Sequence, residues 1–107
     1  MTKQMLIGLL AYSLATVTLN ASAAGDAVAG KLSAETCMGC HAIQGYFNVY
    51  PTYHVPKVGG QSVGYLESAL KAYRDGGRQH ATMNANAAAL SDQDIANIAA
   101  YFAGLSR

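Results

Sequence analysis

The 107-residue sequence has only two cysteines, three histidines and two prolines, it has no tryptophan, and 12% of its residues are charged. Two cysteines exclude a structural zinc site built from two Cys-x-x-Cys pairs, and His54 and His80 do not have zinc-finger spacing. The formal net charge of +1 gives no indication of a nucleic-acid partner. A chain of this length holds at most one ordinary domain.

The two cysteines lie in one motif, Cys37-Met38-Gly39-Cys40-His41. On a helical turn, two thiols at this spacing can each add to a vinyl group of a porphyrin, and the following imidazole can reach the iron from one face. A redox-active dithiol would need a strand-helix-strand pattern and would leave the histidine without a role. A disulfide across two residues would be strained and would close almost no loop. The motif therefore predicts one covalently bound haem with its iron.

Residues 1–24 have the organisation of a secretory signal peptide. Lys3 supplies a positive charge, residues 5–19 form an apolar or hydroxyl-bearing run, and small residues lead up to Ala24. The alternative is an uncleaved N-terminal anchor helix. Cleavage after Ala24 would leave residues 25–107 as one haem domain in the periplasm. Because bacteria attach haem to thiols outside the cytoplasm, the leader and the motif support each other.

We expect three helices, over residues 26–37, 63–75 and 91–103. Asp26 and Ser62 are suitable N-caps, and Ser91 with Asp94 gives a capping-box pattern. Apolar residues recur at i, i+3, i+4 and i+7 on the second and third helices, as Leu66, Ala69, Leu70 and Tyr73, and as Ile95, Ile98, Ala99 and Phe102.

The segments 42–60 and 78–90 are predicted to be irregular, and no strand signal is present. The first of them is rich in tyrosine, and a loop of this length in a small domain is normally functional or fixed to something. A domain of about this length also buries only a limited share of its unfolded surface and usually needs a staple, which a haem would provide. We therefore predict a compact all-α fold wrapped around one haem.

The iron needs a second axial ligand if it is to carry electrons rather than bind a substrate. Met38 lies on the same side as His41, which leaves Met83, His80 and His54 as candidates. We favour Met83, because the polar residues next to it argue against a role as a core thioether.

The sequence resembles the class I c-type cytochromes, most closely the cytochrome c4 and c553 group. The resemblance covers nearly all of residues 25–107. It is carried by Cys37-Met38-Gly39-Cys40-His41, Pro56-Lys57-Val58-Gly59-Gly60-Gln61, Tyr65-Leu66, Tyr73-Arg74-Asp75-Gly76, Met83-Asn84, Leu90-Ser91-Asp92-Gln93-Asp94-Ile95 and Ala100-Tyr101-Phe102. The second Cys-x-x-Cys-His of the dihaem c4 proteins is missing, so this chain corresponds to one half of such a protein.

The resemblance implies the compact helical fold of this family, with the first and last helices crossing near Gly30 and Tyr101 or Phe102. It also implies that His41 and Met83 are the axial ligands of the haem iron. By the same matching, the carbonyl of Pro56 accepts a hydrogen bond from the other ring nitrogen of His41.

We therefore predict a periplasmic monohaem cytochrome c that carries single electrons between redox partner proteins of a respiratory chain and is not an enzyme. The alternatives are a cytochrome c subunit of a larger oxidoreductase and an iron with an open sixth site. We expect contact with a membrane only through partners or an uncleaved leader.

Residues 56–78 carry a surplus of positive charge that would steer an acidic partner to this part of the surface. Lys57, Lys71, Arg74 and Arg78 outnumber Glu67 and Asp75 in this segment. A further hypothesis is that one of the two arginines pairs with a haem propionate.

Overall fold

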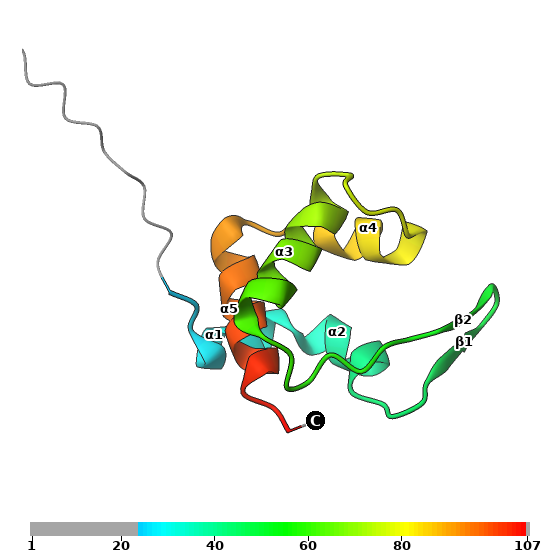
Figure 1. Cartoon of the computed structure of the whole chain (residues 1–107), viewed down its shortest axis with the longest axis horizontal. Coiled ribbons are helices and arrows are strands. Elements are labelled where there is room, and N and C mark those ends of the chain that lie inside the picture. The colour runs from blue at the N-terminus through cyan, green and yellow to red at the C-terminus, as the bar shows by residue number, and fades with distance from the viewer. Residues whose placement is uncertain (1–23, 107) are drawn as a thin grey trace, which may run out of the picture.

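The computed structural model describes residues 24–106, in which five helices pack together and a short hairpin projects from one side (Figure 1). The elements are α1 Ala27–Ser33, α2 Glu35–His41, β1 Phe47–Val49, β2 Thr52–His54, α3 Val63–Arg74, α4 Ala81–Ala87 and α5 Asp92–Ala103. None of the described helices is long and apolar enough to span a bilayer. Apart from Ala24, the predicted leader lies outside the described residues.

The first and last helices cross at very close range. Asp26 caps α1, since its carboxylate accepts the backbone N–H of Val28 at 2.8 Å. A Cβ atom built on the buried Gly30 would lie 1.9 Å from the backbone oxygen of Asn97 and 3.0 Å from the Cβ of Tyr101. Only glycine allows this approach, and the crossing expected near Gly30 and Tyr101 is confirmed.

The core lies where α3 and α5 pack against the junction of α1 and α2. It is formed by Ala34, Leu66, Ile98, Ala99 and Phe102. Ile98 and Phe102 are 2% and 3% exposed, so the apolar face predicted for the last helix is the buried one. The predicted helical fold is confirmed, and the same core residues continue into the wall of the cavity described below.

Both predicted helix starts at Ser62 and Ser91 are confirmed. The Ser62 hydroxyl accepts the N–H of Tyr65 at 3.2 Å. The Ser91 hydroxyl accepts the N–H of Asp94 at 3.1 Å, and the Asp94 carboxylate accepts the N–H of Ser91 at 3.0 Å. The Ser91 hydroxyl also donates to the Asp94 carboxylate at 2.6 Å. This hydrogen bond, with the one from the Ser91 N–H, lowers the pKa of Asp94 below its ordinary value, because both stabilise the ionised carboxylate.

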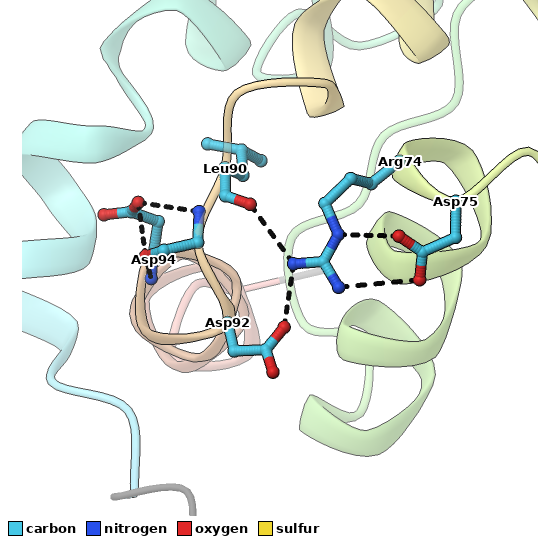
Figure 2. A network of polar contacts seen from close by, with 6 residues as sticks. Arg74, Asp75, Leu90, Asp92 and Asp94 are labelled. Atoms are coloured by element: carbon cyan, nitrogen blue, oxygen red, sulfur yellow. Dashed lines mark hydrogen bonds and ion pairs between the residues drawn. The ribbon is translucent and has the colours of Figure 1, made fainter.

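Arg74, at the end of α3, connects this helix to the start of α5 (Figure 2). Its guanidinium lies 2.8 Å from the Asp75 carboxylate and 2.7 Å from that of Asp92, and it donates to the carbonyl of Leu90 at 3.2 Å. The hydrogen bond from Arg74 lowers the pKa of Asp75. Gly76 follows with a φ of 85°, a left-handed conformation that commonly ends a helix.

The prediction that residues 42–60 contain no regular element is wrong for residues 47–54. β1 and β2 pair antiparallel, with Asn48 opposite Tyr53. Side chains close the turn, since Asn48 donates to the carbonyl of Pro51 at 2.7 Å and Thr52 to that of Val49 at 2.8 Å. Each strand has three residues, which is too short for an alternating pattern to be detectable in the sequence.

The irregular segment predicted over residues 78–90 is wrong as well, because it contains α4. Seven residues rich in alanine form this helix, since alanine has the highest helix propensity, but their length hides any periodicity. The first predicted helix, over residues 26–37, is also divided in two at the fully buried Ala34.

We expect Gly30→Ala to lower the free energy of unfolding by about 1–3 kcal/mol, because its methyl group would push α1 away from α5. Gly64→Ala in α3 is the matched control, since a Cβ there meets no atom within 4 Å. It should raise stability by about 0.5–1 kcal/mol through helix propensity. Denaturant unfolding of the haem-loaded proteins measures both, and equal midpoints for the two variants would contradict the close crossing.

Candidate functional site

A cavity of about 320 Å³ opens between α2, the hairpin, α3 and α4. The five residues predicted from the sequence for haem attachment and ligation all line it: Cys37, Cys40, His41, Pro56 and Met83. The core side chains Leu66, Ile98 and Phe102 form its inner wall. The site is therefore an apolar hollow with thiol, imidazole and thioether groups at its surface.

Helix α2 presents the motif to the cavity. Cys37 and Cys40 are both half-buried and remain separate thiols. Burial raises the pKa of the Cys37 thiol, and the neighbouring Cys40 adds to this effect. One turn of helix thus holds both sulfurs at the same wall of the cavity, in the arrangement that two thioether bonds to one porphyrin would need.

The ring of His41 is oriented by the loop that follows the hairpin. Its Nδ1 donates to the carbonyl of Pro56, at an N···O distance of 2.6 Å. A carbonyl can only accept, so Nδ1 carries the proton and Nε2 is the nitrogen that keeps a lone pair. Metal-binding histidines are commonly held in this way by a hydrogen bond to the other nitrogen.

Met83 reaches the cavity from α4, which lies on the other side of it from α2 (Figure 1). The two rival ligands also line the cavity but have other contacts. His80 is the N-cap of α4, where its Nδ1 accepts the N–H of Met83 at 3.4 Å. The ring of His54 is exposed on the hairpin and packs against Phe47 at 5.0 Å between centroids.

The two arginines of the propionate hypothesis have different positions. Arg78 lines the cavity, and its guanidinium lies over the ring of Tyr73 at 4.5 Å. Arg74 is not among the lining residues, and its guanidinium is held by Asp75 and Asp92. Arg78 is therefore the arginine available to a group in the cavity.

Two residues that the sequence analysis did not single out also belong to the site. The hydroxyls of Tyr53 and Thr82 share a hydrogen bond of 3.0 Å between the hairpin and α4. Both residues line the cavity. The tyrosine-rich composition of the segment before Pro56 was the available signal, but it did not indicate which tyrosine turns inward.

The residues around the cavity fit a porphyrin better than a bare metal ion. Within residues 24–106, no group of three or more histidine, cysteine, aspartate or glutamate side chains could hold a metal ion together. An iron that brings its own four porphyrin nitrogens needs only two axial side chains. His41 and Met83 can supply these, and the two thiols can supply the attachment.

Comparisons with known proteins agree with this chemistry. The chain is 50% identical over 82 residues to cytochrome c-554(548) of Halomonas halodenitrificans, covering 74% of this chain and 95% of that protein. It is 43% identical to cytochrome c4 of Pseudomonas aeruginosa, covering 78% of this chain and 40% of that protein. The cytochrome subunit of sulfide dehydrogenase of Chlorobaculum tepidum is 31% identical, over 73% of this chain and 67% of that subunit. The chain therefore spans the Halomonas halodenitrificans protein almost completely and less than half of the Pseudomonas aeruginosa cytochrome c4.

The fold has a solved counterpart. The structure of reduced recombinant cytochrome c4 from Pseudomonas stutzeri superposes with a TM-score of 0.57 at 27% identity, covering 80% of this chain and 53% of that one. The cytochrome c family profile matches residues 27–106, which include every residue of the cavity wall. The chain belongs to the cytochrome c family, and its cofactor is haem c, an iron porphyrin covalently attached to the protein.

Proposed function

We propose that this protein carries single electrons between redox partners. Its haem would be attached through Cys37 and Cys40 and ligated by His41 and Met83. The observation that carries the proposal is that these four side chains line one apolar cavity, with the first three on α2 and Met83 on α4 across from them. With both axial positions filled, no site is left for a substrate, which favours a carrier over an enzyme.

Haem iron, when bound, supplies a one-electron couple that needs no bond to form or break. The chain sets the conditions for this couple. The Pro56 carbonyl, 2.6 Å from Nδ1, orients the His41 ring and increases its basicity. The Met83 thioether raises the reduction potential. Leu66 and Phe102 exclude water from the inner wall, which tunes the potential as well.

We also propose that residues 1–24 direct export to the periplasm and are removed there, because thioether attachment of haem takes place outside the bacterial cytoplasm. The partner would be a redox protein with an acidic docking face. Arg74 is neutralised by Asp75 and Asp92. The surplus positive charge of residues 56–78 is therefore left to Lys57, Lys71 and Arg78.

A second candidate function is that of an electron-accepting subunit in a larger oxidoreductase. The relative named as the cytochrome subunit of sulfide dehydrogenase supports it, since it matches 73% of this chain. Co-elution of the native protein with a larger dehydrogenase subunit would favour this role. Elution as a free monohaem protein would favour the mobile carrier.

We expect Met83→Ala to abolish the absorbance band at the red end of the visible spectrum that reports methionine–iron bonding in the oxidised protein. Met38→Ala is the matched control, because Met38 lies in the attachment turn and does not line this cavity. It should keep the band. Met83→His should restore a six-coordinate iron with a lower reduction potential, since imidazole lacks the preference of thioether sulfur for reduced iron. A band that survives Met83→Ala would contradict the assignment of the ligand.

We further propose that Arg78 pairs with a haem propionate. Arg78→Gln should lower the reduction potential by on the order of tens of millivolts, because loss of a positive charge near the haem makes the oxidised state easier to reach. Arg74→Gln should leave the potential unchanged and instead lower the unfolding midpoint, since its partners lie outside the cavity. Redox titration and denaturant unfolding of both variants separate these effects, and equal potentials for Arg78→Gln and the wild type would contradict the pairing.

A further inference from the structure

A single side chain of the hairpin connects the two sides of the cavity. Tyr53 lies at the centre of β2, and its hydroxyl is 3.0 Å from the hydroxyl of Thr82, the residue directly before Met83. The contact joins positions 29 apart in the sequence. Its two partners belong to the hairpin and to the first turn of α4, which face each other across the open side of the fold (Figure 1).

The ring of Tyr53 makes a second contact with the same turn. It packs edge-on against His80, with the centroids 4.7 Å apart and the ring planes at 88°. His80 caps α4 and accepts the backbone N–H of Met83 on Nδ1. The backbone N–H of His80 donates to the side-chain oxygen of Asn84 at 2.8 Å. Tyr53 therefore contacts both the cap of α4 and the residue next to the expected iron ligand.

Helix α4 depends on such contacts for its position. It has only seven residues, and a helix of this length has little stability of its own in water. Its second turn is anchored to the α3 side, where Asn84 donates to the carbonyls of Tyr73 and Arg78 at 2.7 and 2.8 Å. The contacts of Tyr53 hold the first turn from the side of the hairpin.

The same hairpin is anchored on the His41 side. Val55, 6% exposed, donates to the carbonyl of Tyr46 at 2.9 Å, and the next residue, Pro56, holds the His41 ring. Pro56, which holds the His41 ring, thus lies three positions after Tyr53, which contacts the first turn of α4. The hairpin consequently helps to set the distance between the two axial ligands.

We propose that Tyr53 is a positioning residue that keeps the Met83 sulfur on the iron by holding the first turn of α4 over the cavity. This inference rests on the proposed function, in which Met83 is the second axial ligand. The hydroxyl pair of Tyr53 and Thr82 carries the effect, because it is the specific hydrogen bond from the hairpin to this turn.

The test measures how readily added imidazole displaces Met83 from the oxidised, haem-loaded protein. Imidazole binds only molecules in which the sulfur–iron bond is open, so its apparent dissociation constant is inversely proportional to the open fraction. Tyr53→Phe removes the hydroxyl and keeps the ring on His80. We expect it to tighten imidazole binding by about 2- to 10-fold, the range for one hydrogen bond between neutral groups.

Two further variants make the test specific. Thr82→Val removes the other hydroxyl and should produce the same shift, and the double variant should add nothing, because both changes break one bond. Tyr50→Phe is the matched control, since Tyr50 lies in the turn of the same hairpin and is 95% exposed. Its imidazole affinity should equal that of the wild type.

Failure of the role proposed for Tyr53 can be distinguished from failure of Met83 as the axial ligand. If Tyr53→Phe binds imidazole with the same affinity as Tyr50→Phe, the inference about Tyr53 is overturned. The absorbance band of the wild type at the red end of the spectrum would then still support Met83 as the ligand. Additive shifts in the double variant also overturn it, because the two hydroxyls would then act independently. A wild-type protein without the band, or a Met83→Ala protein that keeps it, overturns the assignment of Met83 and with it the role of Tyr53.

Discussion

The close crossing of α1 and α5 at Gly30 is the constraint on which the other parts of the structure depend. The approach of the two backbones fixes α5 so that Ile98 and Phe102 face inward, where they serve both the core and the cavity wall. It also sets the position of α2, which follows α1 after a single residue and carries both cysteines. The packing of α1 against α5 therefore helps to position the residues that line the cavity.

The two arginines near the end of α3, Arg74 and Arg78, lie in different surroundings. The carboxylates of Asp75 and Asp92 neutralise the charge of the Arg74 guanidinium, and its contact with Asp92 links α3 to α5. The guanidinium of Arg78, four positions later, lies over the face of Tyr73, and Arg78 borders the cavity. Two similar side chains on one segment thus have different contacts, because helix α3 ends at Arg74.

Local signals predicted the parts of the fold that depend on local interactions. Ser62 and Ser91 mark helix starts because a hydroxyl and an N–H two or three residues later interact within one turn, wherever that turn lies in the fold. The hairpin and α4 were missed, since three-residue strands and a seven-residue helix are too short for a periodic pattern. Their stability comes from contacts such as that between Tyr53 and Thr82, which are distant in sequence.

The sequence alone predicted the attachment chemistry, because Cys37, Cys40 and His41 are close together on one short helix and need nothing else to face the same way. It also determined the caps and buried faces of α3 and α5. Only the tertiary structure decided that Met83 shares a cavity with His41, that Arg78 rather than Arg74 borders it, and that Tyr53 reaches α4. The physical reason is that these relations join segments whose distance is set by helix packing rather than by spacing along the chain.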